Sequence, residues 1–292
     1  MPYLEIFLKS LFEACPDCPD VFIYHTDLNK KQLCHLKKYP TVKTVCLANN
    51  DFIWGPSMAT HRPKLADPRI SYARFLIWTD QMKNYENVVH LDTDLLILGR
   101  LDELFNTDRF TIFAETYQAE DACFYNPLNP GLLNLLEEDG IQPPVVIANC
   151  GVFTVPKKDR TPEDFEMLCY LLKRYAPYVK WADQSIINLW MAKKGINITP
   201  GNQFNFQHRL VAKPGRVPGL SEVKIFHFNG VDLRYRLFLV RCANFLRHLP
   251  WGWDIYRLVF RVAYGLLHLW RSMNSFRFQL KTSRGRTQIR TV

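Results

Sequence analysis

The chain has 292 residues, of which 48% are hydrophobic and 22% are charged. This composition can bury a large core and excludes an intrinsically disordered chain, and the length suits one α/β domain with or without an appendage. The net charge of +9 is unevenly placed, because residues 234–292 carry twelve Lys or Arg and one acidic residue, a balance of +11 that leaves −2 for residues 1–233.

Hydrophobic periodicity predicts helices and strands that alternate along most of the chain. The expected helices span residues 3–14, 69–83, 161–175 and 183–192, and the expected strands span residues 21–24, 44–47, 88–98, 111–114, 145–155 and 224–228. Such alternation is typical of an α/β domain with a mostly parallel sheet flanked by helices. We therefore expect one such domain over residues 1–233.

Residues 234–292 do not alternate in this way, and we expect a basic, aromatic-rich helical appendage there. Arg257, Arg261 and Arg271 fall on one face of a helix whose other faces are apolar, which is typical of a helix lying on a membrane surface. The aromatic residues Trp251, Trp253 and Tyr256 suit a lipid–water boundary. The predicted partner is an anionic membrane surface, and the alternative is a helix packed on the protein's own core.

The N-terminal residues do not form a signal peptide, since they lack a cationic start and a long apolar run. We therefore expect a cytoplasmic protein, peripheral on a membrane, with reduced cysteines. An alternative reading is a zinc module, because Cys15 and Cys18 have ligand spacing and Cys34, His35 and Cys46 follow. Nucleic acid is a poor candidate partner, since the basic tail shows no known nucleic-acid-binding motif.

Asp92 and Asp94 interrupt the apolar run over residues 88–98. In a strand, residues two apart point to the same face, so both carboxylates are expected to converge. Two carboxylates that share a cleft need a cation, and oxygen ligands favour Mg²⁺ or Mn²⁺, which can bridge a diphosphate leaving group. The alternative is a turn at the strand end with two solvated acids.

Several sequence blocks resemble glycosyltransferase family 8, the glycogenin-like and lipopolysaccharide-galactosyltransferase-like group. The blocks are SYAR at 71–74, VHLDTDLLIL at 89–98, LDELF at 101–105, NCGV at 149–152, DQSIIN at 183–188 and HFNG at 227–230. They occur in the family's order, and the resemblance covers residues 3–230, about four fifths of the chain. It implies a GT-A fold with a mixed, mostly parallel sheet, and transfer of a hexose from a UDP-sugar, with retention at the anomeric carbon and Mn²⁺ as the usual metal.

The resemblance also implies roles for single residues. It implies that Asp92, Asp94 and His227 bind the metal, that Asp92 also lies near the donor ribose, and that Asp183 and Gln184 lie near the reacting carbon. The residues expected to contact the donor are Arg74, Asp92, Asn149, Gly151, Gly230 and Arg234. For Arg74 the alternative is a solvated helix residue, for His227 a satisfied strand-end histidine, and for Asp183 a helix N-cap.

Two departures from the family pattern bear on the donor pocket. The family has a strand before the first helix, and here Met1 and Pro2 stand where that strand should end. The family also has a Lys where this chain has Leu233, so either Arg234 replaces it or the diphosphate loses a contact. These departures motivate an alternative function, a degenerate transferase-like protein that binds a sugar nucleotide without turnover.

Overall fold

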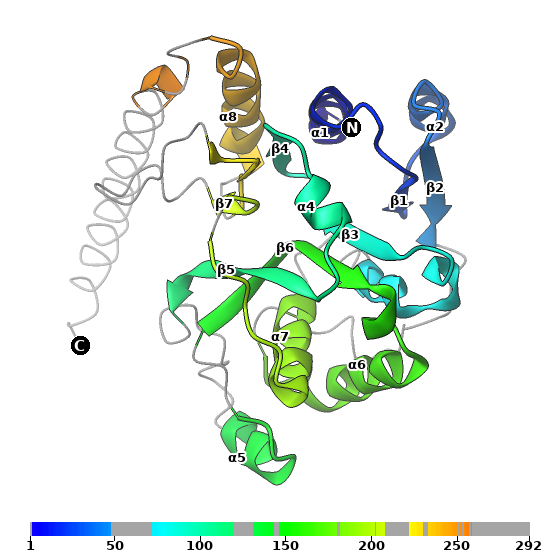
Figure 1. Cartoon of the computed structure of the whole chain (residues 1–292), viewed down its shortest axis with the longest axis vertical. Coiled ribbons are helices and arrows are strands. Elements are labelled where there is room, and N and C mark those ends of the chain that lie inside the picture. The colour runs from blue at the N-terminus through cyan, green and yellow to red at the C-terminus, as the bar shows by residue number, and fades with distance from the viewer. Residues whose placement is uncertain are drawn as a thin grey trace, which may run out of the picture.

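The computed structural model describes residues 2–47, 72–118, 131–142, 146–179, 182–201, 203–207, 222–229, 233–249, 252, 254–256 and 258. Figure 1 shows the arrangement of the elements. The N-terminal part contains α1 (Pro2–Ala14), β1 (Val21–His25), α2 (Lys30–Leu36), β2 (Val42–Cys46), the 3₁₀ helices η3 (Ala73–Trp78) and η4 (Asp80–Met82), β3 (Asn87–Leu91), β4 (Leu95–Ile97) and α4 (Asp102–Phe105). There follow β5 (Thr111–Gln118), α5 (Gly131–Glu138), β6 (Val146–Pro156), η5 (Lys157–Asp159), α6 (Pro162–Tyr175), α7 (Ala182–Lys194), β7 (Phe206–Gln207), β8 (Ile225–His227) and α8 (Leu233–Leu246).

The described strands form three small sheets. Strands β1 and β2 pair in parallel, β6 lies between β3 and β5 with both pairs antiparallel, and β8 lies between an antiparallel β4 and a parallel β7. The structure is therefore mixed α/β, and the expectation of a mostly parallel sheet is wrong for the described strands. Alternating helices and strands give parallel pairs only when each connection returns to the start of the preceding strand. Here β6 runs back along β5 instead.

Helices α6 and α7 pack beside β5 and β6 to form the largest core (Figure 1). Helix α6 begins at an N-cap, Thr161, whose hydroxyl accepts a hydrogen bond from the backbone N–H of Asp164, and Pro162 follows in the first turn. Trp190 of α7 is fully buried and its indole N–H donates to the Asp164 carboxylate at 3.2 Å. The hydrogen bond between Trp190 and Asp164 joins the two helices beside β6, which carries the predicted site residues Asn149 and Gly151.

The expected helix over residues 69–83 and the expected strand over residues 88–98 differ from the structure. The part described from residue 72 onward forms the short helices η3 and η4, which are separated at Thr79, where the backbone is extended. The apolar run is split into β3 and β4, and residues 92–94 form a turn between them. Because the two halves pair with different strands, the run cannot continue as one strand.

Helix α8 lies within the stretch that the sequence assigns to the appendage, and it packs on the body next to α1 and β4 (Figure 1). Leu239, Val240 and Ala243 are buried against Phe226 and Phe228. Tyr256, which the sequence places at a lipid–water boundary, is fully buried with its ring 5.6 Å from that of Phe226. Helix α8 and Tyr256 therefore pack on the protein's own core.

The expected membrane-surface helix, between Asp254 and Met273, lies outside the described residues except for residues 254–256 and 258, and Trp251 and Trp253 lie outside them as well. Within the part of the chain that the structure describes, no helix has the length and apolar character needed to cross a bilayer. The membrane contact of the tail stays a prediction.

A cavity of about 400 Å³ separates β1 from β3. Its lining is mostly apolar and includes Phe7 of α1, Ile23 of β1 and Val89 of β3, and the cavity extends to Arg74 and Asp92. Among the described strands, β1 pairs only with β2, and β3 pairs only with β6. The cavity therefore lies along two strand edges that face each other. It ends at the turn over residues 92–94, which we call the acidic turn.

Asn188 of α7 completes the hydrogen bonding of β6 where β3 has ended. The last paired residues of β3 and β6 are Leu91 and Val152, and beyond them the Asn188 side chain accepts from the N–H of Ala148 at 2.8 Å and donates to its carbonyl at 3.0 Å. Asn188 is 2% exposed. Its amide thus replaces a neighbouring strand at this position.

We expect Asn188→Leu to lower the free energy of unfolding by about 2–4 kcal/mol, because two buried backbone groups lose their partners. Chemical denaturation of the variant and of the parent chain measures the difference. The matched control is Asn134→Leu on the exposed face of α5, for which we expect a change within about 0.5 kcal/mol. Equal stabilities of the two variants would show that the amide does not support β6.

Candidate active site

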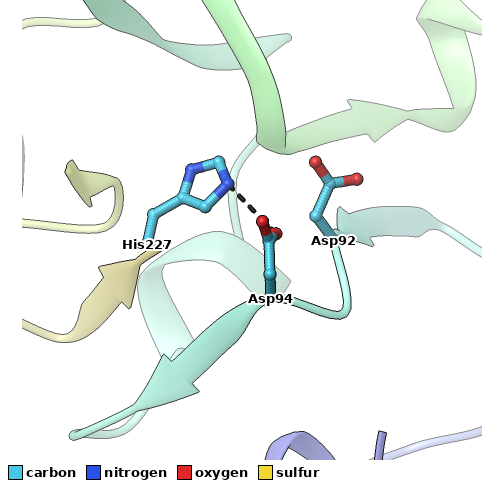
Figure 2. A group of neighbouring side chains, drawn as sticks. All are labelled: Asp92, Asp94 and His227. Carbon is cyan, nitrogen blue, oxygen red and sulfur yellow. Dashed lines mark ion pairs between the residues drawn. The ribbon is translucent and has the colours of Figure 1, made fainter. Parts of the chain in front are cut away.

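Two carboxylates and one imidazole converge where the two three-stranded sheets meet. Asp92 follows the last residue of β3, Asp94 precedes β4, and His227 is the last residue of β8. Their ligand atoms all lie within 4.8 Å of one another. The imidazole of His227 is directed at the Asp94 carboxylate with Asp92 beside it (Figure 2), and its Nε2 lies 3.3 Å from Asp94 Oδ1.

Strand pairing explains this convergence. Leu95 of β4 is the register partner of His227, and the backbone N–H of Phe228 donates to the carbonyl of Asp94 at 3.0 Å. On the other side, the N–H of Asp92 donates to the carbonyl of Gly151 at 2.9 Å. The turn over residues 92–94 is therefore fixed at one end to β6 and at the other to β8. The sequence predicted both aspartates on one face of a single strand. In the structure they lie instead on a turn between two strands.

Gly151 allows the His227 ring to lie directly against the backbone of β6. A Cβ atom at position 151 would lie 2.2 Å from His227 Cε1 and 2.9 Å from its Nδ1, far inside van der Waals contact. The imidazole is 2% exposed, so it has no free volume into which it could move. The resemblance implied that Gly151 contacts the donor, and the structure adds a steric reason for glycine at this position.

Arg74 joins two of the predicted carboxylates. Its guanidinium lies 3.2 Å from Asp92 Oδ1 and 2.9 Å from Asp183 Oδ2, and Nη1 donates to the carbonyl of Cys150 at 2.9 Å. The side chain is only 12% exposed, so the alternative of a solvated helix residue is wrong. Burial by itself lowers the pKa of Arg74, but the negative charges of Asp183 and Asp92 more than offset this and raise it.

The environment keeps Asp92 ionised. Burial by itself raises the pKa of the Asp92 carboxyl, while the positive charge of Arg74 and a hydrogen bond from His90 lower it, and the net result is a pKa well below the usual range. His90 Nε2 lies 3.0 Å from Asp92 Oδ1. Sequence reasoning did not assign a role to His90, which lies in β3 two residues before Asp92.

Of the remaining predicted residues, Asn149 lies in β6 and Gln184 is hydrogen-bonded to that strand. Asp183 lies in the first turn of α7 and is 5% exposed, and Gln184 Oε1 accepts from the N–H of Cys150 at 3.3 Å. Asn149 is 4% exposed and its Oδ1 accepts from the N–H of Gly151 at 2.9 Å. Gly230 lies outside the described residues, and Arg234 belongs to the first turn of α8.

The side chains of Asp92, Asp94 and His227 suit a hard divalent cation. Two carboxylates and one imidazole form a common donor set for Mn²⁺, and Mg²⁺ suits the carboxylates. In the part of the chain that the structure describes, no other His, Cys, Asp and Glu side chains cluster as metal ligands. The cysteines of the suggested zinc module therefore do not assemble. Burial also raises the pKa of the Cys18 thiol to about 12.

Several solved structures with a similar fold are glycosyltransferases. An active-site mutant of LgtC has a TM-score of 0.56 and 18% identity over 79% of this chain and 84% of that chain. The galactosyltransferase LgtC with donor and acceptor sugar analogues has a TM-score of 0.52 and 19% identity over 78% and 83% of the two chains. Mouse xyloside xylosyltransferase 1 has a TM-score of 0.50 and 15% identity over 79% and 93%. At these identities the likeness shows the fold alone.

Comparison of sequences gives two further findings. No curated protein sequence matches the chain significantly. The model of the family described as glycosyl transferase family 8 matches residues 57–232, which is more than half of the chain and includes the acidic turn and His227. The chain therefore belongs to glycosyl transferase family 8.

Proposed function

We propose that this protein is a metal-dependent, retaining glycosyltransferase that moves a hexose from a UDP-sugar to a glycan or glycolipid acceptor. The observation that carries the proposal is the convergence of Asp92, Asp94 and His227 within 4.8 Å in a chain that belongs to glycosyl transferase family 8. The choice of a hexose as the transferred sugar rests on the sequence resemblance to the glycogenin-like and lipopolysaccharide-galactosyltransferase-like group. The proteins of similar fold include both a galactosyltransferase and a xylosyltransferase.

Asp92, Asp94 and His227 would hold the cation, Mn²⁺ or Mg²⁺. A divalent cation in this position supplies positive charge for the diphosphate of the donor as it becomes the leaving group. The protein's part is to hold both carboxylates and the imidazole in place. Arg74 favours ionisation of Asp92 and is itself held by Asp183 and the Cys150 carbonyl. The acidic turn is thus preorganised before any ligand binds.

We propose that Asp183 and Gln184 lie at the reacting end of the donor, and that Asn149, Gly151, Gly230 and Arg234 contact its sugar and diphosphate. Two contacts support this placement. Gln184 is bonded to β6 at Cys150, between Asn149 and Gly151, and Asp183 is joined to Asp92 through Arg74. These side chains position the donor and provide charge, while the acceptor proton passes to the leaving phosphate.

A second candidate function is binding of a sugar nucleotide without turnover. The cavity between β1 and β3 favours it, because this cavity opens along two strand edges beside Asp92. A donor pocket with an open wall holds its nucleotide less rigidly, and misplacement by about 1 Å can cost on the order of 100-fold in rate. Binding and turnover have to be measured on the same preparation to separate the two functions.

We also propose that residues 234–292 contact an anionic membrane surface. The support is the charge of this segment in the sequence, +11 within 59 residues. Because α8 packs on the body, we place the membrane contact in the residues after it, where basic side chains are frequent. Such a contact would bring the enzyme close to lipid-linked acceptors.

The metal assignment is tested by Asp92→Asn and Asp94→Asn. We expect each variant to lose at least about 100-fold of its Mn²⁺-dependent UDP release, because several kcal/mol of charge stabilisation disappear at the leaving group. UDP release from a panel of UDP-hexoses, with and without glycan and lipid-linked acceptors, measures this. The matched control is Asp108→Asn, an exposed aspartate on the loop before β5, which should keep full activity. Near-normal turnover in either site variant would contradict the assignment.

The two candidate functions predict different calorimetric and kinetic results. For a transferase, we expect UDP to bind in the presence of Mn²⁺ and one UDP-hexose to be consumed in repeated cycles. Isothermal titration of UDP and a turnover assay on the same preparation give both quantities. Saturable binding with no donor consumed across the whole panel would instead establish the binding protein.

The membrane proposal is tested on the full chain by vesicle co-sedimentation. We expect the protein to bind vesicles that contain phosphatidylserine and not vesicles of phosphatidylcholine alone. Replacing the five distal basic residues by Gln should weaken binding more than about tenfold, since each contributes roughly 1 kcal/mol near an anionic leaflet. These residues are Arg277, Lys281, Arg284, Arg286 and Arg290. A control variant carries Gln at Lys30, Lys31, Lys37, Lys83 and Lys158. Equal loss in both variants would show that the tail has no special role.

A further inference from the structure

A chain of buried hydrogen bonds links the backbone of β6 to the imidazole of His227. The N–H of Gly151 donates to Asn149 Oδ1 at 2.9 Å, Asn205 Nδ2 donates to the same oxygen at 2.9 Å, and Asn205 Oδ1 lies 2.8 Å from His227 Nδ1. Asn205 is 1% exposed. It directly precedes β7, which pairs in parallel with β8 and thereby brings Asn205 beside His227. Asn205 belongs to none of the sequence blocks that indicated the family.

The direction of every bond in this chain follows from its first member. A backbone N–H can only donate, so the atom of Asn149 that faces Gly151 is the side-chain oxygen. Asn205 then has to present its amide nitrogen to that oxygen, which leaves its own oxygen facing His227. An amide oxygen can only accept, so His227 Nδ1 carries a proton. The neutral imidazole therefore has its unprotonated nitrogen, Nε2, on the side of Asp94.

This tautomer matters because Nε2 and Asp94 Oδ1 are only 3.3 Å apart. Both atoms are acceptors, and two acceptors at this distance are stabilised only by a cation or proton between them. Histidines that bind metals generally donate their second N–H to a fixed acceptor, which sets the ring orientation and the nitrogen offered to the metal. Asn205 supplies that acceptor here, and Gly151 supplies the space for the ring.

We propose that Asn205 is a positioning residue of the metal site, which holds His227 in the Nδ1-protonated tautomer so that Nε2 faces the cation. The proposal rests on the proposed function in that it takes Asp92, Asp94 and His227 as the metal ligands. Its experiment uses tautomer and metal affinity as readouts, so it does not depend on finding a donor sugar or an acceptor.

The first measurement is the tautomer of His227 in the parent chain. Long-range ¹H–¹⁵N spectra of protein labelled with ¹⁵N-histidine, recorded without divalent metal at a pH where the imidazole is neutral, distinguish the two ring nitrogens. His227→Gln identifies the signals by their disappearance. We expect a protonated Nδ1 and an unprotonated Nε2. A His227 protonated at Nε2 would overturn the proposal, whatever the variants do.

The second measurement is Mn²⁺ affinity, by calorimetry or by electron paramagnetic resonance of free Mn²⁺. We expect Asn205→Leu, which removes the acceptor and keeps much of the volume, to weaken Mn²⁺ binding by about 10- to 100-fold and to release His227 into a mixture of tautomers. Asn205→Asp keeps an acceptor for Nδ1 but loses the donor to Asn149, so we expect it to retain the tautomer and to recover part of the affinity that Asn205→Leu loses. The matched control is Asn197→Leu, at an exposed position after α7, with unchanged Mn²⁺ affinity.

Unchanged Mn²⁺ affinity in Asn205→Leu would overturn the proposal, as would equal losses in the Leu and Asp variants. Failure of the proposed function has a different signature. In that case Mn²⁺ affinity would still follow the residue at position 205, while no UDP-hexose would be consumed by the parent chain.

Discussion

The contact between the His227 ring and the backbone of Gly151 is the constraint on which the site depends. His227 ends β8 and Gly151 lies in β6, so the contact holds together two sheets that share no paired strand in the described part of the chain. The acidic turn crosses between the same two sheets, because Asp92 is bonded to Gly151 and Asp94 to Phe228. Any change that separates β6 from β8 would therefore separate the imidazole from Asp92 as well. The geometry of the metal ligands is a consequence of sheet packing.

The polar side chains of the site fall into two groups. Arg74 stands between Asp92 and Asp183, and His227 stands beside Asp94. Removing Arg74 would take a cation from 2.9 Å beside the Asp183 carboxylate, which is 5% exposed, and loss of a partner from a buried charge is costly. Arg74 therefore has a structural reason to be an arginine in addition to any contact with a donor. Its fork-shaped guanidinium reaches two carboxylates and a carbonyl at once, which a lysine ammonium could not do with the same geometry.

The sequence was informative wherever function is carried by short local motifs. The blocks around Asp92, Asn149, Asp183 and His227 indicated the family, which the family match confirms, and local periodicity located α1, α6 and α7. Strand direction was not accessible in this way, because alternation of helix and strand does not specify where each connection returns. The division of the apolar run into β3 and β4 was hidden for the same reason. Both depend on pairing between residues far apart in the chain, such as Leu95 with His227.

Asn205 shows a second limit of reading a sequence. An asparagine between two phenylalanines has no local signal of function, and its role depends on three partners brought in by β6 and β8. Yet the direction of its hydrogen bonds follows from the single fixed donor, the N–H of Gly151. One glycine thus acts twice on the same histidine. Its missing side chain makes room for the ring, and its backbone N–H determines, through Asn149 and Asn205, which ring nitrogen is available to a cation.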